Sequence, residues 1–487
     1  MSDIIGRAKE QAELEAIYNA NESAFVAVYG RRRIGKTYLI KNFFQGKNCV
    51  YFQMTGIYKG ALKKQLERFA KELGTVFYQD ASIKTPANWL EAFEELNKAL
   101  STIAKNKKIV LFFDELPWMH TRKSGIISAL EYFWNRHWVD DKRIKLITCG
   151  SAASWIIKYL IKNRGGLHNR VTHRMRLLPF NLYETALYLK HLGYRCDYPQ
   201  TIKIYMALGG VPFYLKNLKK NLSIDQNIEN LLFAASSPFF DEFDEVFSSL
   251  FENAKHYKEI VTLIAKHKDG IERSVLDEKT KSAGSQGGRL TQRLEDLENA
   301  GFISSYIPFE HKKLGLFYRL SDEYCYFYLQ WIEPLKLRLK QNKISNYWRS
   351  VINTPAYFNW CGYVFENICY KHLPQIRTAL QLDAASLASP WRYTPRKNSK
   401  EPGTQIDLLF DRSDNAITIC EIKYTAEPFS VDKAYAEKLR QRLSIFKEKT
   451  RTKKQLFFAL VSAAGIKPTL YSEDMVTSVV TVEDLFQ

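Results

Sequence analysis

The stretch "YGRRRIGKTYLIKNFF", residues 29–44, decides the fold of the first part of the chain. It contains the pattern G-x-x-x-x-G-K-[ST], formed by Gly30, Gly35, Lys36 and Thr37. The apolar run "SAFVAVY" precedes it and an amphipathic helical pattern follows, which is the context that a phosphate-binding loop requires. Glycines let backbone N–H groups approach phosphates, and the helix N-terminus adds its positive dipole end. The stretch therefore predicts an ATP site, with Lys36 at the β- and γ-phosphates and Thr37 at Mg²⁺.

A second stretch, "KIVLFFDEL" at residues 108–116, supplies the acidic half of such a site. A buried strand that ends in Asp114 would place a carboxylate beside the metal, and Glu115 would polarise an attacking water. An adjacent Asp-Glu pair favours hydrolysis over phosphoryl transfer to a small molecule. We therefore expect an ATPase.

The chain predicts an α/β multidomain protein. Residues 1–178 alternate apolar strands with amphipathic helices, as in a parallel sheet covered on both faces. Strands are expected at 24–29, 49–54, 108–113 and 144–150. The remaining segments predict a helical lid at 179–254, a winged helix-turn-helix at 255–320, a helical connector at 321–355, and a helix, strand hairpin, helix and strand at 356–487.

An ordered set of motifs in the first 250 residues resembles the archaeal-type ATPase family within the AAA+ class: "IIGRAKEQAEL", "YGRRRIGKTYLIKNF", "VLFFDELPW", "LITCGSAASWI", "HNRVTHRMRLLPF" and "GGVPFYL". The resemblance implies a nucleotide-proximal pair, Gly6 and Arg7, and a polar sensor, Ser151. It also implies that Arg170 contacts the γ-phosphate of a neighbouring subunit. This chain has Asn169 where family members usually have glycine, and binding of Arg170 to a lid carboxylate is the alternative.

The predicted nucleotide-binding residues share a place in or beside the phosphate loop. They are Gly6, Arg7, Gly30, Arg31, Arg32, Arg33, Ile34, Gly35, Lys36, Thr37, Tyr38 and Ser151. The three consecutive arginines could instead contact DNA. Because the loop is expected to fold round the nucleotide, electrostatic support of phosphate is the favoured role.

The stretch "GSQGGRLTQRLEDLENAGFI", residues 284–303, is typical of a recognition helix that leads into a wing. Ser285 is the expected N-cap and Gly301 the expected C-cap. Four polar side chains are expected to be exposed and to suit base edges and phosphates: Gln286, Arg289, Gln292 and Arg293. The alternative is a protein–protein spacer, since acidic residues further along this helix would repel phosphate.

The stretch "TQIDLLFDRSDNAITICEIKYT", residues 404–425, predicts a strand hairpin. If Asp411 faces Ala416, Asp407 falls opposite Cys420, one position from Glu421. Glu421 and Lys423 are two apart and point to one face. Two carboxylates and a lysine on a half-buried sheet suit Mg²⁺ and a water beside a scissile phosphate.

This D-x(n)-E-x-K pattern resembles the PD-(D/E)xK nuclease superfamily, although Ile406 stands where the proline of that name would precede the aspartate. The resemblance implies an auxiliary acid at Glu366, and Lys438 and Arg442 suit a phosphate backbone. The expected metal ligands are Thr37, Asp114, Glu366, Asp407 and Glu421. The expected catalytic residues are Glu115, Arg170, Asp407, Glu421 and Lys423.

The balance of charges indicates the class of partner. The formal net charge is +19 and the pI is near 9.3, which indicate a polyanionic partner, most often nucleic acid and here DNA before RNA. Seven cysteines without a C-x-x-C pair indicate reduced thiols and a cytoplasmic setting. No run of eighteen apolar residues predicts a membrane span.

These features support an ATP-regulated enzyme that binds nucleic acid and cleaves it with Mg²⁺. The alternative is a nucleotide switch that binds DNA or a protein and breaks no bond except that of ATP. A processive motor is a third hypothesis, and it requires a homo-oligomeric ring.

Overall fold

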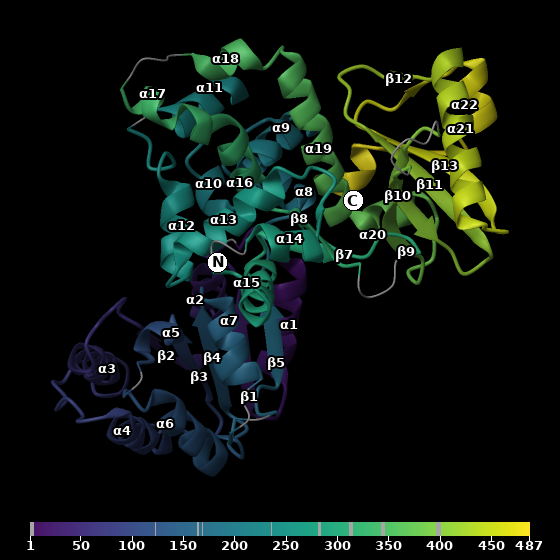
Figure 1. The fold of residues 1–487 in the computed structure, drawn as a ribbon. Helices are drawn as coiled ribbons and strands as arrows, with labels where there is room; N and C mark the ends of the chain where they lie inside the picture. The colour runs from purple at the N-terminus through teal and green to yellow at the C-terminus, as the bar shows by residue number, and fades with distance from the viewer. Residues whose placement is uncertain are drawn as a thin grey trace. The chain divides into compact units, whose positions relative to one another are not determined.

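The computed structural model describes residues 4–121, 123–162, 165–167, 169–234, 236–280, 284–310, 315–341, 346–395 and 401–487. The chain forms two compact units. Unit 1 comprises Met1–Pro179, Ser248–Glu252 and Glu295–Gly301, and unit 2 comprises Phe180–Phe247, Asn253–Leu294 and Phe302–Gln487. We describe each unit by itself (Figure 1).

Unit 1 is built on a five-stranded sheet in the order β2-β3-β4-β1-β5, in which all neighbouring strands run parallel. The strands are β1 Ala24–Tyr29, β2 Cys49–Thr55, β3 Lys108–Asp114, β4 Ile144–Gly150 and β5 His173–Arg176. Strand β4 is buried along its whole length, as expected of a parallel strand that is covered on both faces. The predicted parallel sheet and its four predicted strands are confirmed, whereas the short polar strand β5 was not predicted.

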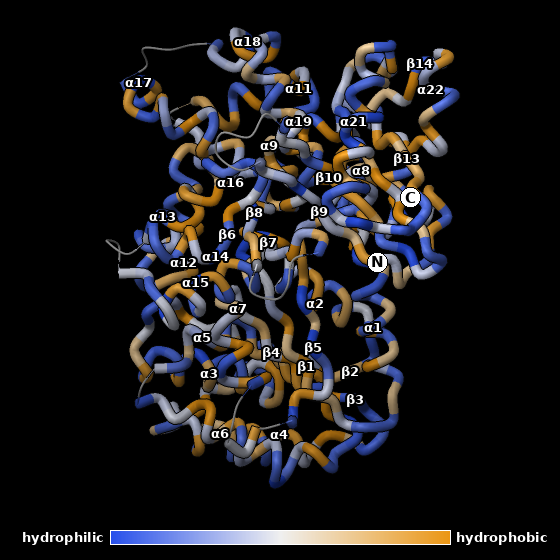
Figure 2. Tube along the Cα trace, turned by 45° about the vertical axis from the view of Figure 1, so that its right-hand side comes forward, coloured by the Kyte–Doolittle hydropathy of each residue, from blue (hydrophilic) through white to orange (hydrophobic). Residues whose placement is uncertain are grey.

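The helices of unit 1 cover both faces of this sheet and produce two hydrophobic cores. Alternate residues of β1 enter the two cores: Phe25 and Ala27 join one, and Val26 and Val28 join the other. Figure 2 shows the hydrophobic residues gathered along β1 and β4. The helices are α1 Ala8–Asn19, α2 Lys36–Gln45, α3 Leu62–Phe77, α4 Trp89–Ser101, α5 Leu116–Met119, α6 Ile126–Phe133, η1 Trp134–Trp138, α7 Ala153–Ile156 and η2 Ile157–Ile161.

Unit 2 begins with a helical region. Its helices are α8 Leu182–His191, α9 Tyr198–Leu208, α10 Pro212–Leu215, α11 Ile224–Ile228, η3 Glu229–Phe233 and α12 Glu242–Leu250, and later α16 Glu323–Phe327, η5 Tyr328–Ile332, η6 Glu333–Leu335, α17 Lys336–Lys340 and α18 Tyr347–Val351. The later group pairs with the earlier one, because the Trp348 ring stacks on Phe233 and its indole N–H donates to Asp225 at 2.9 Å. The described residues of 321–341 and 346–355 are therefore largely helical, as predicted, and they pack into this region.

A small three-stranded sheet follows within the residues 254–320. Its element order is α13 Ala254–Ala265, β6 Ile271–Glu272, α14 Arg273–Lys279, α15 Gly288–Asn299, β7 Ile303–Tyr306 and β8 Phe317–Leu320. The strands pair antiparallel in the order β6-β8-β7. We call this segment the middle module.

The C-terminal module carries a mixed five-stranded sheet in the order β15-β13-β11-β10-β9. Strands β9, β10 and β11 pair antiparallel, whereas β11, β13 and β15 pair parallel. Its elements are α19 Pro355–Lys371, α20 Leu373–Ala379, β9 Leu387–Tyr393, β10 Thr404–Asp411, β11 Ala416–Lys423, β12 Phe429–Ser430, α21 Lys433–Thr450, β13 Gln455–Ser462, β14 Ile466–Lys467, α22 Leu470–Met475, β15 Ser478–Thr481 and η7 Glu483–Phe486. The hairpin β10–β11 is as predicted, and strands β9 and β15 extend the sheet beyond it.

All seven cysteines are free thiols. Within the described ranges, no helix is both long enough and apolar enough to cross a membrane.

Candidate functional site

The phosphate loop connects β1 to α2 in unit 1. Gly30 has a φ of 147°, and a Cβ atom at this position would lie 2.2 Å from the carbonyl oxygen of Leu177. Gly35 caps α2 with a φ of 89°. The buried Lys36 donates from Nζ to the carbonyl oxygens of Gly30 at 2.9 Å and Arg31 at 2.8 Å. The lysine thus lies inside its own loop, at the N-terminus of α2.

Thr37 and Asp114 meet at the carboxyl edge of the sheet. The Thr37 hydroxyl lies 3.0 Å from both carboxylate oxygens of Asp114, to which it donates. Asp114 ends β3 and is 3% exposed. Burial, followed by the charge of Glu115, raises the pKa of Asp114, while the Thr37 hydrogen bond acts in the opposite direction. Hydroxyl and carboxylate oxygens are the ligands that Mg²⁺ prefers, so these two residues fit the predicted metal.

Glu115 is fixed by the residue that the family resemblance marks as the sensor. Its backbone has a φ of 49°, in the left-handed region, at the start of α5. Ser151 follows β4 and donates to Glu115 Oε2 from its backbone N–H at 3.0 Å and from its hydroxyl at 2.9 Å. The structure therefore brings Ser151 and Glu115 together beside Asp114.

The arginines of the loop differ in burial. Arg31 is 1% exposed, which favours the predicted support of phosphate over a contact with DNA. Arg32 and Arg33 are half-buried, and Tyr38 is exposed. Arg7, which is also buried, donates to the carbonyl oxygen of Ile34 at 3.1 Å and so stabilises the phosphate loop.

Arg170 is exposed and precedes β5. Strands β1 and β5 run parallel, with Val26 opposite His173 and Tyr29 opposite Arg176. The phosphate loop follows the carboxyl end of β1, whereas Arg170 lies before the amino end of β5, so the length of the strand separates them. This register gives no support to a contact with the nucleotide of the same chain, and a contact across subunits stays a prediction.

The acidic residues of the hairpin β10–β11 lie closer together than predicted. Leu408, and not Asp407, pairs with Cys420, so the predicted register was wrong by one residue. Carrying this register one step further brings Asp407 level with Glu421. The Asp407 carboxylate accepts a hydrogen bond from the backbone N–H of Ile422 at 3.3 Å.

Glu421 has three partners from the protein. It is 3% exposed, and Lys423 Nζ lies 2.7 Å from its Oε1. The Tyr435 hydroxyl donates to the same oxygen at 2.5 Å, and Arg442 forms an ion pair with Oε2. Burial alone would raise the pKa of Glu421, but Lys423 and Arg442 outweigh it and lower the pKa. Arg442 therefore neutralises Glu421, and its contact with a phosphate backbone stays a prediction.

Asp407 and Glu366 have the opposite electrostatic setting. Burial, followed by the charge of Glu421, raises the pKa of Asp407 to about 6. Burial, followed by the charge of Asp407, raises the pKa of Glu366 well above its ordinary value. Among the described residues, no three His, Cys, Asp or Glu side chains form a group that could hold a metal ion. Asp407 and Glu366 are nevertheless oxygen ligands of the right chemical class.

The structure differs from two predictions for the stretch 284–303, namely Ser285 as the N-cap and Arg293 as an exposed side chain. Helix α15 begins at Gly288, so Ser285 is not its N-cap. Ser285 is buried and its hydroxyl accepts a hydrogen bond from Arg293, so this arginine fastens the loop before the helix. The other predicted contacts, Gln286, Arg289, Gln292 and Lys438, are exposed.

Sequence reasoning missed Arg319, a basic residue in the cavity that Glu366 and Asp407 line and that we call the acidic pocket. A cavity of about 190 Å³ is lined by Glu366 and Asp407 and also by Arg319 from β8 of the middle module. The guanidinium centre of Arg319 lies 3.8 Å from the Tyr370 ring and 4.1 Å from the Tyr306 ring. Nothing in the local pattern of β8 indicates this contact, since about fifty residues separate Arg319 from Tyr370.

The chain resembles known proteins along most of its length. An uncharacterized protein of Methanocaldococcus jannaschii is 22% identical over 425 residues, which are 86% of this chain and 87% of that protein. An uncharacterized ATP-binding protein of the same organism is 44% identical over 43 residues, 9% of this chain and 73% of that protein.

Two solved structures are also similar. The Walker-type ATPase of Pyrococcus abyssi is 17% identical, with a TM-score of 0.48 and coverage of 67% of this chain and 96% of that one. The Aeropyrum pernix ORC2 protein, in its ADPNP-ADP complexes, is 15% identical, with a TM-score of 0.44 and coverage of 70% and 96%.

Residues 4–218 match the family described as "ATPase domain predominantly from Archaea". The matched range includes the phosphate loop, Asp114, Glu115 and Ser151. Residues 4–218 of the chain therefore form an ATPase domain of a kind found predominantly in Archaea.

Proposed function

We propose that the chain is an ATP-hydrolysing enzyme that binds nucleic acid and cleaves it with Mg²⁺ in its C-terminal module. One observation carries the cleavage part of this proposal. Asp407, Glu421 and Lys423 gather on two neighbouring strands, with the lysine ammonium 2.7 Å from the Glu421 carboxylate. Buried charges of this kind reduce stability and cluster at functional sites.

The ATPase unit supplies the residues for hydrolysis. Lys36 binds the β- and γ-phosphates, and Thr37 and Asp114 hold Mg²⁺, which neutralises developing charge on the phosphates when it is bound. Glu115 orients the attacking water, and its hydrogen bonds to Ser151 set the direction of its carboxylate. Arg170 acts across subunits of a homo-oligomer.

The middle module supplies nucleic-acid binding. Its order of helix, strand, two helices and two strands supports a winged helix-turn-helix, with α15 as the recognition helix. Gln286, Arg289 and Gln292 are exposed there. The net charge of +19 favours DNA as the partner and predicts that binding weakens steeply with salt. Residues 179–254 serve as the lid of the ATPase.

The C-terminal module resembles PD-(D/E)xK nucleases in the residues that it gathers. Asp407 and Glu366 offer carboxylate oxygens to Mg²⁺, which supplies a Lewis acid for the scissile phosphate when it is bound. The Lys423 ammonium, paired with Glu421, orients the attacking water. Tyr435 and Arg442 hold Glu421 beside that lysine.

A second candidate function is a nucleotide switch that binds DNA or a protein and has no nuclease activity. The observation that favours it is the setting of Glu421, whose two oxygens accept from Tyr435, Lys423 and Arg442. A carboxylate that is satisfied by three protein donors is also what a structural ion-pair cluster would show.

A cleavage assay separates these two functions. Labelled single- and double-stranded DNA is incubated with Mg²⁺, with and without ATP, for the wild type, Lys36→Ala, Lys423→Ala and the control Lys447→Ala, which removes an exposed lysine of α21. The proposal expects Lys423→Ala to lose cleavage and keep ATP hydrolysis, while Lys447→Ala keeps both. Loss of DNA cleavage in the Lys36→Ala variant would show that ATP controls cleavage. ATP hydrolysis and DNA binding without any cleavage by the wild type would leave the switch as the function.

A further inference from the structure

The acidic pocket of unit 2 is built by two modules. The middle module contributes Lys268, Tyr306 and Arg319, and the C-terminal module contributes Glu366, Arg392 and Asp407. The backbone N–H of Phe309 donates to the carbonyl oxygen of Pro390 at 2.9 Å, and the Phe309 ring lies 5.8 Å from that of Phe446. These contacts join the segment after β7 to β9 and to α21, and so connect the middle module to the C-terminal module.

Arg319 is fixed in this wall by its two aromatic neighbours. The Tyr306 and Tyr370 rings lie 4.1 and 3.8 Å from its guanidinium centre. Tyr370 is itself anchored, because its hydroxyl donates to the backbone carbonyl of Asp407 at 2.6 Å. The charge of Arg319 acts on the neighbouring Glu366 carboxylate and counteracts the rise in its pKa. A half-buried guanidinium that is held by two aromatic rings at the wall of a cavity is suited to recognise an anion.

Two further cations line the cavity. Lys268 Nζ lies 4.3 Å from the centre of the Tyr363 ring, and Arg392 pairs with Asp269 at 2.9 Å while its side chain is 59% exposed. The rings of Tyr306, Phe317 and Tyr363 are half-buried along the same cavity. Cations interleaved with aromatic rings are typical of surfaces that bind single-stranded nucleic acid, in which phosphates meet cations and bases stack on rings.

The size of the cavity selects among forms of nucleic acid. Its volume of about 190 Å³ is smaller than the roughly 300–1,000 Å³ of sites for drug-sized ligands. A duplex, whose major groove alone is about 12 Å wide, cannot enter such a cavity. One unpaired nucleotide can place its base or its phosphate there.

We propose that this pocket binds an unpaired nucleotide of a nucleic-acid strand, with Arg319 as the phosphate-binding residue supplied by the middle module. The inference rests on the proposed function and names its substrate class: single strands or strands with unpaired ends. Arg319 positions the phosphate beside Asp407 and Glu366. The middle module thus forms part of the candidate cleavage site, in addition to the proposed surface that binds duplex DNA.

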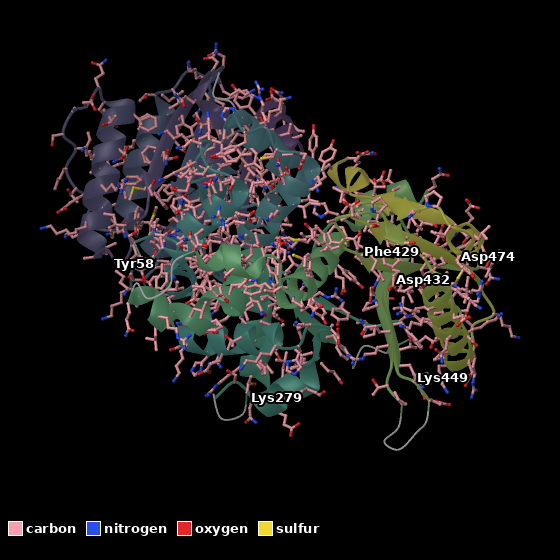
Figure 3. All side chains as sticks on the ribbon, turned by 90° about the horizontal axis from the view of Figure 1, so that it is seen from above. Tyr58, Lys279, Phe429, Asp432, Lys449 and Asp474 are labelled. Atoms are coloured by element: carbon pink, nitrogen blue, oxygen red, sulfur yellow. The ribbon has the colours of Figure 1, made fainter. Side chains whose placement is uncertain are left out.

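Binding without cleavage tests the inference. The full chain is titrated in EDTA against fluorescein-labelled oligothymidylate, a blunt duplex of equal length, and an abasic strand of equal length, with fluorescence anisotropy as the readout. The variants are Arg319→Gln, Arg319→Lys, Arg392→Gln and Lys279→Gln. Lys279 is the charge-matched control, because it is exposed on α14 and does not line the cavity, and Figure 3 shows it at the edge of the side chains.

We expect the wild type to bind oligothymidylate more tightly than the abasic strand, and Arg319→Gln to leave its affinity for the duplex unchanged. Arg319→Gln should weaken binding of oligothymidylate about tenfold and reduce its salt slope by about one, since one charge-assisted contact is lost. The affinity of Arg319→Lys for oligothymidylate should fall between those of the wild type and Arg319→Gln. The affinity of Lys279→Gln should match that of the wild type. Because Arg319 packs between two modules, the exposed Arg392→Gln variant provides a second reading, with a smaller loss on the same strand.

Equal losses of affinity for the duplex and for the single strand in Arg319→Gln, or equal losses for Arg319→Gln and Lys279→Gln, would overturn the inference. So would unchanged affinity for oligothymidylate in both Arg319→Lys and Arg392→Gln. These readings need no metal and no bond cleavage. Failure of the cleavage assay alone would therefore refute the nuclease and leave the pocket as a binding site.

Discussion

His372 predicts a specific loss of stability in acid. It follows α19, is 1% exposed, and accepts a hydrogen bond at Nε2 from the backbone N–H of Leu182 at 3.1 Å. Its Nδ1 lies 2.7 Å from the carbonyl oxygen of Ile368, to which it donates. With one ring nitrogen accepting and the other donating, only the neutral imidazole fits. Burial, with a further contribution from Lys371, lowers the pKa of His372 to about 4.

The size of the effect follows from the two pKa values. In the unfolded chain the imidazole has a pKa of about 6.5, and each unit of difference is worth about 1.4 kcal/mol. The pKa of His372 is lower in the folded state. As the pH falls below 6.5, the unfolded chain therefore binds a proton at this imidazole before the folded chain does. Stability is constant above this range and decreases by about 3 kcal/mol between pH 6.5 and pH 4, where the folded form also becomes protonated.

Hydrogen exchange of the Leu182 amide measures this directly, since that amide donates to the imidazole. Its protection, corrected for the intrinsic rate, is followed by mass spectrometry from about pH 8 to about pH 4.5 in the wild type and His372→Gln. We expect protection in the wild type to drop by up to about a hundredfold across this range. Glutamine does not titrate, so the variant should start lower and lack the drop. Parallel curves for the two proteins would refute the reasoning.

Three other substitutions have defined outcomes. Gly30→Ala places a Cβ atom 2.2 Å from a backbone carbonyl and should abolish binding of a fluorescent ATP analogue, whereas Gly46→Ala, with no atom within 4 Å, should leave it intact. Thr37→Val removes the hydroxyl that contacts Asp114 and should lower the ATPase rate at least about a hundredfold, and a serine should restore it; a normal rate in the valine variant would contradict the assigned role. Lys371→Met leaves Glu323 buried without its 2.6 Å partner and should destabilise unit 2 by about 3 kcal/mol in urea unfolding; an unchanged midpoint would show that the carboxyl becomes protonated at little cost.

The strands of unit 1 could be predicted because each is a continuous apolar run, and β4 is buried throughout. Strand β5, "HRMR", could not, since only Met175 of its four residues is buried and no apolar run marks it. The phosphate loop was predictable because its chemistry is local. Lys36 and Thr37 are neighbours in sequence, and Asp114 follows an apolar strand.

The acidic pocket could be predicted only in part. The carboxylates of the hairpin β10–β11 were recognised, but the register was wrong by one residue because the turn "DRSDN" allows more than one pairing. Two of the three partners of Glu421, Tyr435 and Arg442, come from α21, and Arg319, which lines the cavity with Glu366, comes from the middle module. Such contacts depend on packing between elements far apart in sequence, and Arg319 on β8 has no neighbouring motif that marks it.

Helix α19 has a consequence for dissecting the chain. Its 17 residues span about 25 Å. Trp360, near its first turns, packs 5.6 Å from the Phe327 ring of the helical region, whereas Phe365 packs 5.4 Å from Tyr424 after β11. The helix therefore packs against aromatic residues of both the helical region and the C-terminal module. A truncated protein that begins at residue 356 would expose Trp360 to water. One that ends there would expose the Phe327 ring, on which Trp360 packs. Limited proteolysis should accordingly release no stable fragment at this boundary, and the candidate nuclease can be studied only with its helical neighbour attached.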